Sequence, residues 1–105
     1  MKRHTKHIIH LVKKRIAEID PLADVILFGS RARGDEKADS DWDVLILTNY
    51  PVDLITERKF RNELYNLELE TGEPFSVFAY SKKDWNTRQK VTPFYRNVTK
   101  EGVLI

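Results

Sequence analysis

Residues 29–43 read GSRARGDEKADSDWD and lie directly between two apolar runs, VILF at 25–28 and VLIL at 44–47. These runs are rich in β-branched residues and are too short to be helices, so they predict two buried strands. The segment between them begins with Gly29-Ser30 and ends with Asp41 and Asp43, two acids separated by one residue. A polar turn joining two strands, with acids at the start of the second, therefore decides the fold and places a candidate site.

Upstream of this turn, apolar residues recur at helical spacing over residues 5–19, and Thr5 is the expected N-cap of that helix. Pro21 ends the pattern, because the residue before a proline is pushed out of the helical region. The first strand is expected over residues 22–28 and the second over residues 42–47.

Downstream, Asp53 is the expected N-cap of a helix that continues to Thr71 and ends at Gly72. The aromatic and β-branched stretch at 74–80 predicts a third strand. Two short helices follow over residues 82–90 and 93–101, with Ser81 and Thr92 as their N-caps and Gly102 at the end of the second. The order predicts an α+β fold, a small mixed β-sheet flanked by helices, in one domain over residues 1–105.

The composition excludes several classes of protein. The 105 residues contain no cysteine, which excludes disulfides and thiolate metal sites and favours a reducing compartment such as the cytoplasm. No apolar run approaches the roughly 20 residues of a membrane helix, and the N-terminus lacks the apolar core of a signal peptide. The formal net charge is +2. Six basic residues without an acid occupy the first fifteen positions and form either a phosphate- or partner-binding face or, as is commoner, the solvated side of an amphipathic helix: Lys2, Arg3, Lys6, Lys13, Lys14 and Arg15.

The two acids have a geometry that suits a metal ion. Alternate side chains of a strand share a face, so Asp41 and Asp43 are expected to project together while Trp42 turns into the core. Two adjacent carboxylates repel each other unless a cation lies between them. Hard oxygen ligands of this kind favour Mg²⁺ or Mn²⁺, whose remaining ligands are commonly water and phosphate oxygens.

The turn itself has features of a phosphate site. Gly29 lets an anion approach the backbone closely, Ser30 adds a hydroxyl donor, and Arg31 or Arg33 supplies a guanidinium. Gly29 and Gly34 also have the spacing of a P-loop, but Asp35-Glu36 follow where that motif needs Lys and then Ser or Thr. The sequence therefore does not predict a P-loop.

The turn resembles the signature of the minimal nucleotidyltransferases of the DNA polymerase β superfamily. The resemblance lies in Gly29-Ser30 followed after ten residues by Asp41-x-Asp43, with Arg33-Gly34 and Ser40 in between. The resemblance implies Mg²⁺-dependent transfer of a nucleoside monophosphate from an NTP to a hydroxyl, with release of pyrophosphate. It implies that Asp41 and Asp43 are catalytic metal ligands and that the nucleotide phosphates are held by Gly29 and Ser30, with Arg33 and Ser40 at matching positions of the motif.

The sequence departs from this family at one important position. The family usually carries a third acid on a later strand, and the expected equivalent here is Ser76, which has no negative charge. Glu73 is the best available substitute. Activity is therefore expected to be weak, to need a carboxylate from a partner, or to be lost.

The acceptor of the nucleotidyl group has to come from elsewhere, because the chain has almost nothing beyond the expected core. Small members of the family resemble the antitoxin half of toxin–antitoxin pairs with helical partners, so the acceptor is expected to be such a protein or an RNA. A nucleotide- or partner-binding protein of the same fold is the alternative, and the near-neutral charge disfavours a general nucleic-acid binder. The histidines at positions 4, 7 and 10 are expected to be exposed rather than to bind metal.

Overall fold

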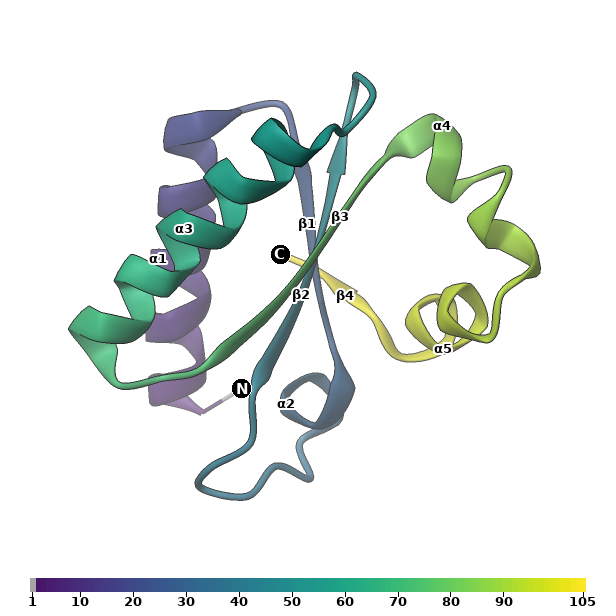
Figure 1. The fold of residues 1–105 in the computed structure, drawn as a ribbon. Coiled ribbons are helices and arrows are strands. Elements are labelled where there is room, and N and C mark those ends of the chain that lie inside the picture. The colour runs from purple at the N-terminus through teal and green to yellow at the C-terminus, as the bar shows by residue number, and fades with distance from the viewer. Residues whose placement is uncertain (1) are drawn as a thin grey trace.

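The computed structural model describes residues 2–105 and contains a four-stranded mixed sheet in the order β3-β2-β1-β4 (Figure 1). The strands are β1 Asp24–Phe28, β2 Trp42–Thr48, β3 Phe75–Ser81 and β4 Val103–Leu104. Strand β1 runs antiparallel to both β2 and β4, whereas β2 and β3 are parallel. The predicted α+β fold with a small mixed sheet is therefore confirmed.

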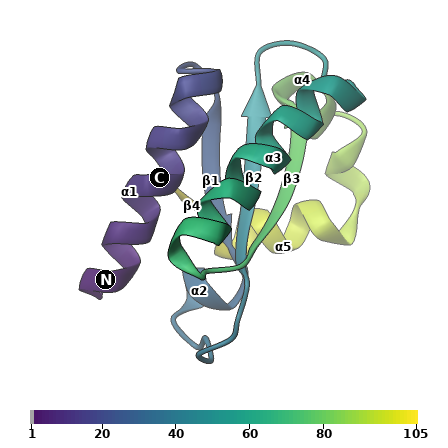
Figure 2. The ribbon, with the colours of Figure 1, turned by 60° about the vertical axis from the view of Figure 1, so that its left-hand side comes forward.

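Helices cover both faces of this sheet. Helices α1 (Arg3–Ile19) and α3 (Leu54–Thr71) lie side by side on one face, and α4 (Lys82–Trp85) and α5 (Pro93–Glu101) lie on the other (Figures 1 and 2). A 3₁₀ helix, η1 (Gln89–Val91), connects α4 to α5. The five-residue helix α2 (Gly29–Arg33) lies at one end of the sheet, where the chain passes from β1 to β2 (Figure 1).

Most of the expected capping residues are confirmed. Asp53 accepts a hydrogen bond from the Thr56 amide at 2.8 Å, Ser81 and Thr92 cap α4 and α5 in the same way, and Gly72 ends α3 with φ of 76°. The prediction for Thr5 was wrong, because α1 begins two residues earlier and Thr5 is buried within the helix.

Three other boundaries differ from the expectation. The first strand begins at Asp24 rather than at residue 22, because Leu22 is exposed in a turn where its amide donates to Asp20. The expected helix over residues 82–90 stops at Trp85 and continues as a turn and η1. Strand β4 was not predicted.

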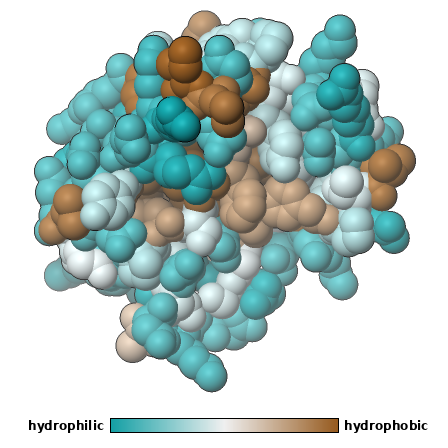
Figure 3. All heavy atoms as spheres, in the orientation of Figure 1, coloured by the Kyte–Doolittle hydropathy of each residue, from teal (hydrophilic) through white to brown (hydrophobic). Residues whose placement is uncertain are grey.

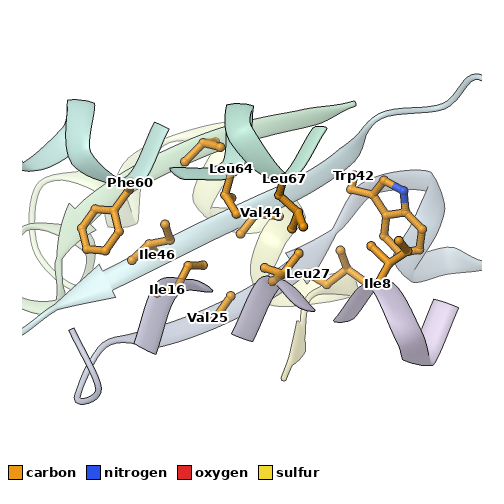
Figure 4. Packing of buried hydrophobic residues seen from close by; sticks show 12 residues of the cluster. Ile8, Ile16, Val25, Leu27, Trp42, Val44, Ile46, Phe60, Leu64 and Leu67 are labelled. Atoms are coloured by element: carbon orange, nitrogen blue, oxygen red, sulfur yellow. The ribbon is translucent and has the colours of Figure 1, made fainter. Parts of the chain in front are cut away.

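The larger part of the core lies between the sheet and the α1 and α3 layer. Figure 4 shows Ile8 and Ile16 of α1, Phe60, Leu64 and Leu67 of α3, and Val25, Leu27, Trp42, Val44 and Ile46 of the strands packed together. Residues 44–46 of β2 are fully buried because helices cover both faces of that strand, as the continuous apolar run predicted.

A smaller, aromatic cluster lies on the opposite face. It contains Phe28, Leu45, Leu47, Trp85 and Val98, with Tyr80, Phe94 and Tyr95 packed around them. On the surface in Figure 3, polar groups cover most of the helices, and apolar groups are visible in the band between the two helical layers. No helix within residues 2–105 has both the length and the apolar character needed to cross a membrane.

Candidate active site

The close approach of Asp43 to Gly29 forms the centre of the candidate site. Strand pairing sets Phe28, the last residue of β1, opposite Asp43 of β2, and Gly29 follows immediately. Gly29 has φ of 76°, a left-handed conformation that side chains disfavour. A Cβ at this position would also overlap the Asp43 carboxylate. Glycine is therefore required at this position for two reasons: the left-handed backbone conformation and the space that the Asp43 carboxylate fills.

The two acids lie at the same end of the sheet as Ser76. In the parallel pair β2 and β3, Ser76 is in register with Asp43, and its hydroxyl donates a hydrogen bond of 2.9 Å to Asp41 Oδ2. Trp42 points to the other face and is fully buried among the residues of α1 and α3 (Figure 4). The alternation expected from the strand is therefore present, and a neutral hydroxyl borders both acids.

The acids are electrostatically unfavourable to each other. Burial and then the negative charge of Asp41 raise the pKa of Asp43, Glu101 adds to the effect, and the positive charge of Arg33 opposes it. Arg33 does not fully offset the negative charge. A divalent cation between the two acids would relieve this repulsion, and their oxygens are the ligands that Mg²⁺ or Mn²⁺ prefers.

Arg33 and the Gly29 amide bind the same carboxylate, that of Glu101 at the end of α5. Gly29 N–H donates to Glu101 Oε1 at 3.2 Å, and Arg33 Nη1 donates to Oε2 at 2.9 Å. Arg33 Nε also donates to Asp35 at 3.2 Å. The hydrogen bond to Glu101, followed by that to Asp35, raises the pKa of the Arg33 guanidinium. The amide and the guanidinium expected to hold a phosphate thus share one internal anion.

Ser40 and Arg31 hold the turn together instead of facing the acids. The Ser40 hydroxyl accepts from the Lys37 amide at 2.9 Å, and its carbonyl accepts from Arg31 Nε and Nη2 at 3.2 and 3.1 Å. The Arg31 guanidinium lies 4.6 Å from the centre of the Trp42 ring. Of the two arginines considered from the sequence, the structure therefore places Arg33 beside the acids and Arg31 beneath the turn. Ser30 is half-buried, and its carbonyl accepts from the Gly34 and Asp35 amides.

The structure places Glu73 away from the two acids. Its carboxylate accepts from Trp42 Nε1 at 2.9 Å and lies 2.6 Å from His4 Nε2. Burial acts to raise its pKa, but the hydrogen bonds from Trp42 and His4 and the charge of Arg31 outweigh burial and lower it. Glu73 thus anchors Trp42 and the start of α1, and the interpretation of this residue as a substitute third acid was wrong.

One pocket of the described surface lies away from the acids. A pocket of about 470 Å³ lies at the opposite end of β3, lined by residues such as Val52, Tyr80, Asp84 and Arg88. It is separated from Ser76 by roughly 15 Å of strand. The candidate site is instead the polar end of the sheet between α2, the starts of β2 and β3, and the end of α5.

The sequence profile of the nucleotidyltransferase domain family matches residues 9–105. The chain belongs to this family. A relative in Methanocaldococcus jannaschii, named "Putative protein adenylyltransferase MJ0604", is 36% identical over 86 residues, which cover 77% of this chain and 75% of the relative. This nucleotidyltransferase therefore resembles a relative named as a transferase over most of the length of both chains.

Three crystal structures share the fold of this nucleotidyltransferase, each covering 95% of its chain. A toxin–antitoxin complex with AMP-PNP matches with a TM-score of 0.63, 20% identity and 70% of its chain covered. A mutant of the toxin–antitoxin MntA-HpeT matches with a TM-score of 0.61, 19% identity and 70% covered. A structure described as a putative nucleotidyltransferase from Sulfolobus solfataricus matches with a TM-score of 0.54, 21% identity and 80% covered.

Sequence reasoning missed one residue that contacts the candidate site. Glu101 contacts Gly29 although 72 positions separate them in the chain. The sequence predicted the helix that ends at Glu101 but not the return of the chain beside β1 as β4, and that return brings the end of α5 to Gly29. Nothing in the sequence around Glu101, a single acid before the helix-ending Gly102, indicated a contact with Gly29.

A metal ion at this site would depend on ligands from outside the protein. Within residues 2–105, no group of three or more His, Cys, Asp or Glu side chains is arranged to hold a metal ion. His7 and His10 are exposed on α1, in agreement with the expectation for the histidines. Asp41 and Asp43 fit a hard divalent cation whose remaining ligands are water and nucleotide oxygens, since their mutual repulsion is only partly offset by Arg33.

Proposed function

We propose that this nucleotidyltransferase transfers a nucleoside monophosphate from an Mg²⁺- or Mn²⁺-bound NTP to a hydroxyl group of a protein or RNA acceptor. The observation that carries the proposal is the packing of the Asp43 carboxylate against Gly29, beside Asp41 and Arg33. Acids and phosphate donors are thereby within reach of one polyphosphate tail. Two repelling carboxylates beside a backbone amide and a guanidinium suit a metal-bound polyphosphate.

Each residue has a distinct role in this proposal. Asp41 and Asp43 would hold the cation, which would neutralise charge on the phosphates and the leaving pyrophosphate. The Gly29 amide, Ser30 and Arg33 bind phosphate oxygens, and Ser40 and Arg31 keep the turn in shape. The side chains orient the α-phosphate for in-line attack, so catalysis rests on position and charge rather than on a protein nucleophile.

ATP is the proposed nucleotide, and a partner protein is the proposed acceptor. The relative named as a protein adenylyltransferase supports both choices, and the toxin–antitoxin neighbours support a role as the antitoxin that modifies a helical toxin-like subunit. An RNA hydroxyl is the second acceptor to be tested. The lack of cysteine supports action in a reducing compartment such as the cytoplasm.

One observation favours a second function, that of a binding protein with little or no transferase activity. Ser76 occupies the position beside Asp43 on β3 and donates to Asp41. A neutral hydroxyl cannot deprotonate the acceptor as a carboxylate can. In this second function the protein binds nucleotide or only its partner and neutralises that partner by forming a complex.

The two functions are separated by a label-transfer assay. The protein is incubated with radiolabelled ATP, CTP, GTP or UTP, with Mg²⁺ or Mn²⁺, and with either the product of the neighbouring reading frame or total RNA. If the protein is a transferase, the acceptor should be labelled with ATP. Asp41→Asn and Asp43→Asn should each lose at least about 99% of the label, because removing charge stabilisation at such a site lowers the reaction rate by about 10²-fold or more.

The control variant is Asp39→Asn, which removes an exposed charge from the same turn and is expected to retain label transfer. A stable complex with the partner and no labelled product under any condition would establish the binding function instead. Label transfer that persists in both Asp41→Asn and Asp43→Asn would contradict the proposed site.

A further inference from the structure

Glu101 binds the two groups to which the proposed function assigns a phosphate. One of its carboxylate oxygens accepts from the Gly29 amide at 3.2 Å, and the other accepts from Arg33 at 2.9 Å. These contacts use both oxygens of one anion, as a bridging phosphate would. The protein's own carboxylate therefore already satisfies both donors.

The charges around Arg33 strengthen this observation. Arg33 is shared between Glu101 and Asp35, and its charge also acts on Asp43, which packs against Gly29. One guanidinium thus interacts with three carboxylates, so the phosphate end of the site has a local excess of negative charge. A polyphosphate that entered with Glu101 in place would meet repulsion as well as occupied donors.

The geometry at the end of α5 allows the side chain to leave while the helix stays. Val98 is buried, and a Cβ on Gly102 would overlap the Val98 carbonyl and Ile26, so the backbone of the helix end packs tightly against β1. The Glu101 side chain, in contrast, is 23% exposed and has access to solvent. Rotation about its own side-chain bonds is enough to free Gly29 and Arg33.

We propose that Glu101 is an internal substitute for the phosphate, which binds the Gly29 amide and Arg33 until a polyphosphate displaces it and which thereby sets the nucleotide affinity of the site. This inference rests on the proposed function, because it assumes that the Gly29 amide and Arg33 are the groups that bind phosphate. It adds a residue on α5 that the family motif at residues 29–43 does not contain.

Titration calorimetry with inorganic tripolyphosphate in EDTA tests this proposal without metal or chemistry. Glu101→Gln is compared with the wild type and with Asp39→Asn, which removes the same charge from an exposed position in the neighbouring turn. Removing the competing charge-assisted contact is expected to tighten tripolyphosphate binding on the order of tenfold. The control should stay within about twofold of the wild type, since an exposed charge is screened.

Equal or weaker binding by Glu101→Gln would overturn the proposal, and weaker binding would mean that Glu101 holds Gly29 and Arg33 in place for the phosphate. If Glu101→Gln fails to fold, as judged by circular dichroism, Glu101→Asp replaces it. That variant is one methylene too short to bridge both donors but keeps the charge, so tighter binding than in the wild type is still expected, with a smaller gain than for Glu101→Gln. The label-transfer assay tests the proposed function separately. It requires the metal ion that Asp41 and Asp43 would hold, whereas the tripolyphosphate titration is done without metal.

Discussion

Gly29 and Gly34 are a natural pair for measuring how closely the site is packed. Both have a left-handed backbone, with φ of 76° and 84°, but a Cβ at Gly34 would meet no atom within 4 Å, whereas a Cβ at Gly29 would overlap Asp43. Gly34→Ala is expected to lower the free energy of unfolding by about 1–2 kcal/mol, the cost of the left-handed conformation alone. Gly29→Ala adds the displacement of Asp43, so a loss on the order of 3 kcal/mol or more is expected.

Urea denaturation of both variants measures this difference, and nucleotide binding gives a second readout. Gly34→Ala should bind Mg·ATP as the wild type does, whereas Gly29→Ala should lose binding because Asp43 is moved. Equal losses of stability in the two variants would show that Asp43 does not lie against the Gly29 backbone in solution.

The raised pKa of Asp43 has a consequence for stability that can be tested by pH. Burial and the charges of Asp41 and Glu101 disfavour its ionised form in the folded state. Between the ordinary value of 3.8 and the raised value, the folded state therefore binds more protons than the unfolded state, and stability falls as pH rises through this window. Ionised Asp43 thus opposes folding at neutral pH.

Asp43→Asn is accordingly expected to be more stable than the wild type at pH 7 and to lose that advantage below the ordinary pKa. Thermal unfolding from pH 3 to pH 8 measures the trend. Adding Mg²⁺ or Mn²⁺ should stabilise the wild type at pH 7 and leave Asp43→Asn unchanged. A variant that is less stable than the wild type across the whole range would contradict the direction assigned to Asp43.

At the scale of elements, α3 shows how burial rather than residue type sets stability. Leu64 is fully buried against the sheet, and Leu69, on the same helix, is 67% exposed. Leu64→Ala is expected to cost about 2–5 kcal/mol through lost contacts and a cavity, and Leu69→Ala less than about 0.5 kcal/mol. Chemical denaturation compares the two. A similar cost for both would mean that the outer face of α3 is covered in solution, for example by a second protein.

Local patterns were sufficient to predict the elements whose signals lie within a few residues. The apolar spacing of α1 and α3 and the short apolar runs of β1, β2 and β3 predicted each element to within two residues at either end. Thr5 failed as an N-cap because its place on the buried face of α1 outweighed its propensity to cap. Strand β4 has only two residues, Val103 and Leu104, and forms because β1 has a free edge, which no local pattern reveals.

The same limit applies to the candidate site. Asp41, Asp43 and Gly29 could be predicted because two adjacent strands and the turn between them bring these residues together. Ser76 could be aligned with Asp43 because a parallel neighbour has a simple register. Glu101 could not be predicted, because its position depends on how α5 packs against the aromatic cluster and on the pairing of β4 with β1.

At the scale of the whole molecule, the two helical layers leave one end of the sheet for polar chemistry. Helices α1 and α3 bury one face and α4 and α5 the other (Figures 1 and 2). The acids, the turn and Glu101 meet at the end of the sheet beside α2. A ligand at this end would contact α2, β2 and α5 together. Binding is therefore expected to stabilise the entire fold rather than one segment.

Ligand binding at this end should be visible as a shift of the unfolding temperature. At a concentration one hundred times its dissociation constant, Mg·ATP is expected to add about 2.7 kcal/mol to the free energy of unfolding, which corresponds to roughly 10–20 °C for a chain of this size. Differential scanning fluorimetry with ATP, CTP, GTP and UTP, with and without Mg²⁺, measures the shift and ranks the bases. The shift should be much larger with the cation, because a metal ion would bridge the phosphates and the two carboxylates, and it should be largely lost in the Asp41→Asn, Asp43→Asn double variant, which has no carboxylates to hold that ion. An equal shift in that double variant would place the nucleotide elsewhere, and the pocket beside α4 would be the next site to test.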